Sequence, residues 1–195
     1  VATGGVERME LGGTTIFNET GADVDFRIES DNKANMFYLD AGNDRIGFGL
    51  SSPLSFAHFQ RNSAGSVSAG NETVLSLENN NSCILQFFSP SANVNQIRFG
   101  DPADNGAGFI EYNHNGDKFS IGVGGPTKLT LDSSGRLGLG TTSPTQLLEI
   151  NGASNPAVLI KDTTNDVISY IFAENDHGTV GTASSHPFVF NINNG

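Results

Sequence analysis

The chain has 195 residues, of which 36% are hydrophobic, and it carries a formal net charge of −11. This acidity argues against nucleic acid and anionic membrane surfaces as partners, because both attract basic proteins, and no apolar run approaches the ~20 residues that span a bilayer. A single Cys excludes an intrachain disulfide, and 24 Gly with no Trp are typical of short strands joined by many turns. We therefore expect an all-β chain whose thin core is shared with identical neighbours.

The first expected element is a β-hairpin, which is followed by a Gly-rich segment. Phe26–Glu29 and Met36–Leu39 flank a polar turn, and this pattern predicts two antiparallel strands. In Ile46–Gly49, apolar residues alternate with Gly, so one face of the strand has no side chains and a neighbour must pack close to it. In an intertwined oligomer, this neighbour can be a sister chain. Pro53 then ends the strand ladder, because it has no N–H to donate.

Two further hairpins follow the same pattern of strand, polar turn and strand. Leu75–Glu78 and Cys83–Phe88 flank one turn, and Val158–Lys161 and Val167–Phe172 flank another. Cys83 opens an apolar run, so we expect its thiol to be buried and unreactive.

The Gly-rich segment returns later in the chain with the same turn and the same alternation. Leu131–Pro144 repeats the pattern of Leu39–Pro53, and such long-period self-similarity is typical of an array built from one supersecondary unit. Each repeated Arg is either a surface strand residue or the ion-pair partner of the Asp that opens the turn or of an Asp on a sister chain. We interpret the repeated positions as structural, namely Asp40, Arg45, Gly47, Gly49, Pro53, Asp132, Arg136, Gly138, Gly140 and Pro144.

The repeats divide the chain into three modules, residues 1–55, residues 56–146 and an incomplete module of residues 147–195. The loose boundaries are Pro53–Ala69 and Pro144–Asn155, each of which follows a Gly-rich segment. The chain starts and stops at similar points of its own pattern. We therefore expect that this is a segment of a longer fibre and that the native polypeptide continues on at least one side.

No residue pattern points to a catalytic, cofactor-binding or metal site. The Gly-rich runs precede no helix pattern, as a phosphate cradle requires, and no Gly-x-Ser-x-Gly elbow is present. Asp101–Gly106 lacks two acidic ligands of an EF-hand loop, so we interpret it as a solvent-exposed turn. The four histidines are His58, His114, His177 and His186. They lack zinc-ligand spacing, so we expect them at surface or turn positions. A metal site formed by a ring of His or Asp from three chains remains an alternative.

We therefore expect that the chain is not an enzyme and needs no cofactor. One enzymatic alternative stays open, because glycoside hydrolysis needs only two carboxylates ~5–10 Å apart, and Glu111 and Asp117 are candidates. The absence of Trp argues against this alternative, because sugar-processing grooves often use aromatic stacking.

Part of the chain resembles a known family. Leu131–Pro144, followed by Leu147–Ile150, resembles the repeat of tail-fibre and related fibre proteins of tailed bacteriophages, in particular marine ones. Ile97–His114 is similar to the stretch that precedes this repeat, and Glu7–Met9 to the strand that leads into it, whereas Ala41–Asp44 departs from the family's turn. The resemblance implies an elongated fibre on a virion, usually a parallel homotrimer that serves in host attachment.

Together, these observations predict an all-β, elongated array of short β-hairpin modules, β-prism-like or β-sandwich-like, in an intertwined parallel homotrimer. The predicted function is a structural virion fibre for host attachment or spacing. Its expected partners are itself, other virion proteins, and a host surface glycan or outer-membrane protein. The alternatives are a glycan-degrading depolymerase of a phage appendage and a bacterial surface adhesin. Contact residues are expected in the loops Pro90–Gln96, Asp101–Gly108 and Asn175–His186.

Overall fold

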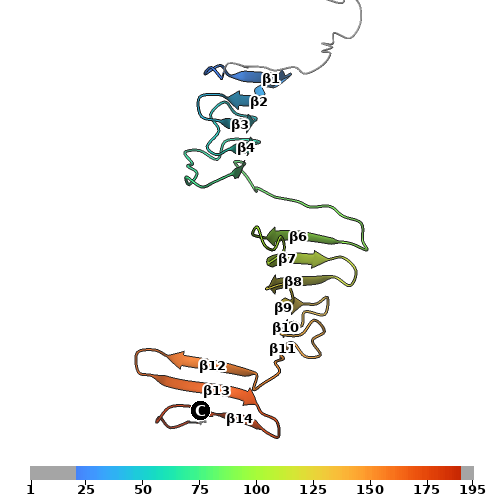
Figure 1. Cartoon of the computed structure of the whole chain (residues 1–195), viewed down its shortest axis with the longest axis vertical. Coiled ribbons are helices and arrows are strands. Elements are labelled where there is room, and N and C mark those ends of the chain that lie inside the picture. Colours follow the sequence, from blue (N-terminus) through green and yellow to red (C-terminus); the bar gives the residue numbers. More distant parts are fainter. Residues whose placement is uncertain (1–20, 190–195) are drawn as a thin grey trace, which may run out of the picture. The chain divides into compact units, whose positions relative to one another are not determined.

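The structure is a computed structural model that describes residues 21–189, and it shows an all-β chain, as predicted. In this part of the chain, 14 strands form three sheets and no helix is present (Figure 1). The chain divides into two compact units between Leu85 and Gln86. Sheet A lies in the first unit and sheets B and C lie in the second. The strand predicted at Glu7–Met9 lies outside the described residues.

Sheet A has five strands in chain order, so each strand pairs with the next. The first predicted hairpin is confirmed, because β1 pairs antiparallel with β2, and β2 then pairs antiparallel with β3. The next two steps are parallel, β3 with β4 and β4 with β5, and the sequence pattern did not predict them. The strands are β1 (Phe26–Ser30), β2 (Lys33–Asp40), β3 (Arg45–Phe48), β4 (Ala57–Gln60) and β5 (Leu75–Glu78).

Sheet B has six strands, which are again neighbours in chain order. The strands from β6 to β10 form an antiparallel meander, in which the turn that opens with Asp132 joins β9 to β10. β11 then pairs with β10 in parallel. The strands are β6 (Val94–Phe99), β7 (Gly108–Asn113), β8 (Lys118–Val123), β9 (Thr127–Leu131), β10 (Leu137–Leu139) and β11 (Leu148–Ile150).

Sheet C contains the last predicted hairpin, which is confirmed as the antiparallel pair β12 and β13, and adds β14 antiparallel to β13. The expected loop Asn175–His186 therefore contains a strand, as the expected loop Pro90–Gln96 contains the start of β6. The strands are β12 (Ala157–Asp162), β13 (Val167–Ala173) and β14 (Gly178–Thr182).

The middle predicted hairpin is wrong in its second half. Leu75–Glu78 forms β5, but Cys83–Phe88 is not assigned to any strand. β5 pairs with β4 instead of with the segment that follows it. The expected burial of Cys83 is also wrong, because this residue is exposed in a segment that no sheet covers.

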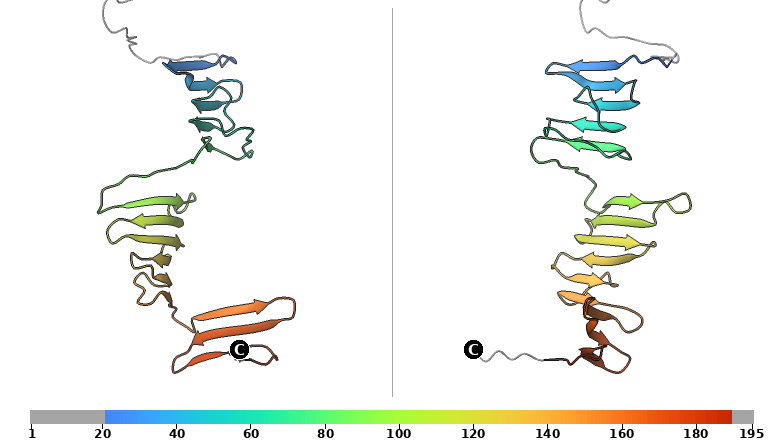
Figure 2. Two further views of the ribbon diagram at one scale, coloured as in Figure 1. Left: turned by 180° about the vertical axis from the view of Figure 1, so that it is seen from behind. Right: turned by 90° about the vertical axis from the view of Figure 1, so that its left-hand side faces the viewer.

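Both Gly-rich segments are followed by a short return loop and a parallel strand. The return loops are residues 49–56 and residues 140–147, and they contain the buried Pro53 and Pro144. The proline was expected to end the ladder because it has no N–H to donate, and parallel neighbours usually need a connection of a dozen or more residues. Each loop instead brings the chain back to the same sheet edge (Figure 2). The expected module boundaries after residues 55 and 146 thus fall between strands that pair within one sheet.

Candidate functional site

The repeated strand glycines leave room for the return loops of their own chain. A Cβ atom at Gly47 would lie 2.6 Å from the carbonyl oxygen of Leu50, and one at Gly138 would lie 2.6 Å from that of Thr141. Real Cβ atoms do not approach other atoms so closely. The neighbour predicted from the bare strand face is therefore a loop of the same chain, so these glycines do not require a sister chain.

The second glycine of each segment lets the backbone turn at the end of its strand. Gly49 has φ of 90° and Gly140 has φ of 78°, values that disfavour residues with a side chain. A Cβ atom there would also collide with a backbone carbonyl oxygen of the returning chain, that of Gln60 beside Gly49 and that of Asn151 beside Gly140. The glycines of the two copies therefore have the same backbone geometry and the same kind of close neighbour.

The second repeated Arg is held by the Asp that opens its turn. Arg136 Nη2 lies 2.7 Å from Asp132 Oδ2, and the backbone N–H of Arg136 donates to the same carboxylate at 3.0 Å. The N–H of Ser134 donates to it as well. These hydrogen bonds hold the pKa of Asp132 below its ordinary value, and the bond from the backbone N–H of Arg136 contributes most. The result is a closed turn between β9 and β10.

The first repeated Arg has a different partner. Arg45 Nη1 donates to the carbonyl oxygen of Pro53 at 2.9 Å, so it fastens the return loop directly. The expected ion pair with Asp40 is not found among the described residues, because Asp40 instead accepts hydrogen bonds from the backbone and side chain of Asn43. The structure thus brings together the Arg and the Asp of the second copy but not those of the first.

The buried part of the chain is polar rather than apolar. Among the described residues, every buried one is glycine, proline or polar, and no hydrophobic side chain is buried. The buried residues of β3 to β5 and of β8 to β10 share one face of their sheet with the return loops. The buried set is Gly47, Pro53, Ser55, His58, Glu78, Ser120, Gly122, Thr130, Gly138 and Pro144.

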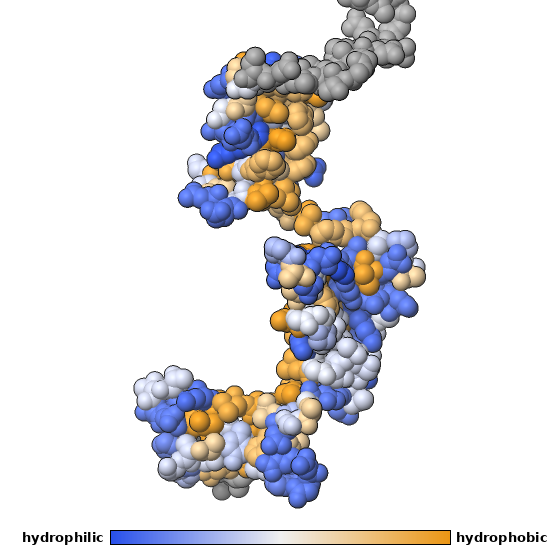
Figure 3. Space-filling model, viewed as in Figure 1, coloured by the Kyte–Doolittle hydropathy of each residue, from blue (hydrophilic) through white to orange (hydrophobic). Residues whose placement is uncertain are grey.

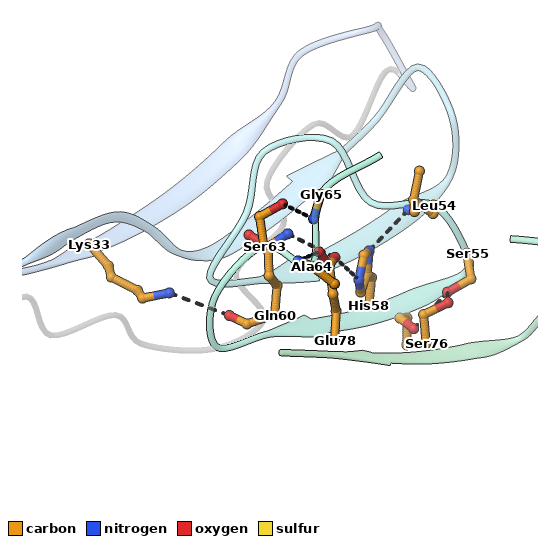
Figure 4. Close-up of polar contacts among 11 residues, drawn as sticks. Lys33, Leu54, Ser55, His58, Gln60, Ser63, Ala64, Gly65, Ser76 and Glu78 are labelled. Carbon is orange, nitrogen blue, oxygen red and sulfur yellow. Dashed lines mark hydrogen bonds and ion pairs between the residues drawn. The ribbon is translucent and has the colours of Figure 1, made fainter. Parts of the chain in front are cut away.

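A cluster of polar side chains lies on this face of sheet A (Figure 4). His58 on β4 is 1% exposed, so the expectation of a surface or turn position is wrong for this histidine. Its Nε2 lies 3.0 Å from Glu78 Oε2 on β5, and its Nδ1 accepts the N–H of Leu54 at 3.3 Å. Because Nδ1 accepts, the ring proton is on Nε2 and points at the carboxylate. Both ring nitrogens are therefore engaged in contacts within the cluster.

Glu78 ties the loop between β4 and β5 to the sheet. Its carboxylate accepts from the side-chain amide of Gln60 at 2.8 Å and from the N–H of Ala64 at 2.6 Å. These hydrogen bonds, with that of Gln60 first, hold the pKa of Glu78 below its ordinary value, and burial opposes them. The cluster therefore stabilises the loop. No sequence motif marked it, although His58 and Glu78 both alternate with apolar residues in their strands.

Acid should weaken the fold through Glu78. A carboxyl whose pKa is lowered by folding stabilises the folded state above its unfolded pKa, and this contribution is lost as the pH falls from near 4.5 through the lower folded value. Between about pH 5 and pH 3, we expect the urea midpoint of the native chain to fall more steeply than that of Glu78→Gln. Glu72→Gln, at an exposed position of the same loop, should follow the native chain. Parallel curves for the native chain and Glu78→Gln would contradict this role.

Two further groups of acidic residues lie in exposed turns. Asp101 accepts backbone N–H groups within its own turn, which agrees with the expected solvent-exposed turn. Glu174, Asp176 and His177 place ligand atoms within 4.8 Å of one another in the turn between β13 and β14. All three are exposed, and His177 lies in ion-pair distance of both acids. This turn accounts for its own contacts without a further group.

The two carboxylates considered as a glycosidase pair are engaged separately. Glu111 on β7 accepts from the side chain of Gln96 on the neighbouring strand. Asp117 lies in the turn that precedes β8 and accepts from the hydroxyl of Tyr112 at 3.0 Å. Each acid thus has a structural partner.

The other face of sheet A is apolar across all five strands. Two columns of apolar residues cross the sheet, and in one of them Phe48 stacks on Phe59 with 4.2 Å between ring centroids. The residues of both columns share a face because side chains alternate along a strand. We call these residues the apolar face of sheet A: Ile28, Phe37, Phe48, Phe59 and Leu77 in one column, and Phe26, Leu39, Ile46, Ala57 and Leu75 in the other.

Sheet B repeats this arrangement across its six strands. Its opposite face carries Ser120, Thr130 and Gly138, which the return loop helps to bury. The apolar face of sheet B consists of Ile97, Ile110, Ile121, Leu129, Leu139 and Ile150 in one column, and of Tyr112, Phe119, Leu131, Leu137 and Leu148 in the other.

Among the described residues, no side chain of these two apolar faces is buried. Leu148 is 55% exposed, Leu75 is 51% exposed and Ile97 is 44% exposed. Hydrophobic side chains gather over the strands and hydrophilic ones over the connecting loops (Figure 3).

No helix in the described part of the chain is long and apolar enough to cross a membrane. No protein-family model matches this chain, and no curated protein matches it either.

Proposed function

We propose that this chain is a segment of a virion fibre and that it assembles as a parallel homotrimer through its two apolar faces. One observation carries the proposal: apolar columns cross every strand of sheets A and B, yet no hydrophobic side chain of the described residues is buried. A single-layer sheet is stable only when its apolar face packs against another element. Each large side chain on these faces gains about 1.5–3 kcal/mol when it is fully buried.

Identical copies of the chain are the best candidates for this cover. The return loops already cover the polar faces, so a partner has access to the apolar faces. Association of identical chains brings equivalent apolar faces together and closes with cyclic symmetry. The three-fold state and the parallel orientation follow the resemblance of Leu131–Pro144 to phage fibre repeats.

The repeated architecture supports a mechanical role. In both copies of the Gly-rich motif, the glycines contact the return loop, and the loop leads to a strand that pairs in parallel. The polar side chains around these loops hold the loops in place. Such a chain serves as a spacer or an attachment device on the virion. Its further partners are other virion proteins and, where the fibre touches the host, a surface glycan or an outer-membrane protein.

Electron microscopy of the purified chain tests this function. A fibre segment should appear as straight rods of constant thickness, because the resemblance to phage fibre repeats implies an elongated assembly. The same preparation should leave bacterial surface glycans intact during prolonged incubation. Round particles, or release of short oligosaccharides, would contradict the proposed function, and the second outcome would favour a depolymerase.

A further inference from the structure

The segment Cys83–Phe88 lies at the boundary of the two units and is not assigned to a sheet. Ile84 is 77% exposed, Leu85 is 57% exposed and Phe88 is 86% exposed. The segment contains no charged residue. Short, uncharged, apolar segments of this kind pair readily with an open strand edge.

The same sequence pattern pairs as a strand at two other places. Met36–Leu39 follows a strand and a polar turn and belongs to β2, which pairs with β1. Val167–Phe172 follows a strand and a polar turn and belongs to β13, which pairs with β12. Cys83–Phe88 follows β5 and a polar turn in the same way. It therefore has the sequence of a second hairpin strand, but its own chain does not use it as one.

The turn after β5 does not fold the chain back. The side chain of Asn79 donates to the carbonyl oxygen of Ser82 at 2.9 Å, and no strand pairing joins β5 to the residues that follow it. β5 is the last strand of sheet A, so its outer edge is open.

Ile84 lies next to the apolar face of sheet A, but its side chain remains exposed. It lines a cavity of about 520 Å³ together with Phe48, Phe59 and Leu77. A strand paired to the open edge of β5 would continue the column that ends at Leu77. The chain thus has an unpaired apolar segment, Cys83–Phe88, and an unpaired sheet edge at β5.

We propose that, in the assembled protein, Cys83–Phe88 of one copy pairs antiparallel with β5 of a second copy. This exchange rests on the proposed homotrimer, in which each copy gives its segment to the next and receives one in turn. In the register of β1 with β2, Ile84 lies opposite Leu77, as Phe37 lies opposite Ile28. Ile84 then extends the apolar column of the receiving sheet. The absence of charge in the segment lets two acidic chains approach at this point.

Disulfide trapping tests the exchange. In a Cys83→Ser background, Leu77→Cys and Ile84→Cys place one thiol on each of the two strands that are proposed to pair. After oxidation of the native assembly, we expect most of the protein to run as covalently linked chains on a denaturing, non-reducing gel. Monomers with an internal disulfide would show that the segment folds back on its own chain, and a trimer without a disulfide would show that the strands do not pair. Either result overturns the exchange.

A matched pair within one chain controls for geometry. Ile28→Cys with Phe37→Cys in the same background joins residues that lie opposite each other in one copy, so it should give monomers with an internal disulfide. Failure of the exchange remains distinct from failure of the homotrimer. A trimeric native chain whose trapping variant closes internally loses only the exchange, whereas a monomeric native chain loses both.

The natural Cys83 provides a second readout. It uses the native chain, so it does not require the variant with Leu77→Cys and Ile84→Cys to assemble. This thiol is exposed in the single chain. Pairing with a neighbour should make it react with a thiol reagent at least about 100-fold more slowly in the assembly than in the denatured chain. Cys83→Ser with Asn115→Cys, which moves the thiol to an exposed turn, should react fast in both states. Fast reaction of Cys83 in the native assembly would overturn the exchange.

Discussion

Replacing Leu131 by Asp should dissociate the assembled protein, whereas replacing Ser133 by Asp should leave it intact. Both residues are exposed in the single chain, and Leu131 is 43% exposed, so neither change buries a charge within one copy. Leu131 lies on the apolar face of sheet B, and Ser133 lies two positions further, in the following turn. An apolar interface would place the new carboxylate in a water-free contact in every copy, at a cost of at least several kcal/mol.

Size-exclusion chromatography with light scattering measures the difference. We expect Leu131→Asp to elute as monomer or as unfolded chain, and Ser133→Asp to elute with the native mass. Equal masses for both variants and the native protein would show that this face is not part of an interface.

The second large effect is expected at Gly140. In Gly140→Ala, the new Cβ atom meets the carbonyl oxygen of Asn151 and the backbone is held at φ of 78°. Backbone strain costs about 1–2 kcal/mol, and the displaced strand adds about 1–3 kcal/mol. We therefore expect a loss of about 3 kcal/mol in the free energy of unfolding, measured by urea denaturation.

Gly135→Ala provides the matched control. Gly135 has φ of 74°, but a Cβ atom there has no neighbour within 4 Å. This variant should lose only the strain contribution of about 1–2 kcal/mol. If both variants lost the same amount, the close approach of the returning strand to Gly140 would contribute nothing to stability.

Local patterns in the sequence predicted the antiparallel elements well. A polar turn between two short alternating runs identified β1 with β2 and β12 with β13, because this type of pairing depends on neighbouring residues. The bare strand face at Gly47 also predicted a close neighbour correctly. The identity of that neighbour depends on the path of the return loop, which the alternation does not encode.

The parallel pairs and the polar cluster could not be predicted in this way. Pro53 looks like the end of a ladder, yet the loop around it is fastened by Arg45 and returns the chain to the same edge. Alternation along β4 shows that His58 and Phe59 point to opposite faces, but it does not show which face is covered. The covered face is the polar one, since the loops pack there, and this reverses the usual inference from hydrophobicity to burial.

The solution mass of the purified native chain tests the central claim most directly. Light scattering should give a mass of about three times 20.5 kDa, and this mass should persist in mild denaturant because the apolar faces of sheets A and B are buried between copies. A folded monomer of about 20.5 kDa would contradict the account, since the apolar faces would then be stable in water without a partner.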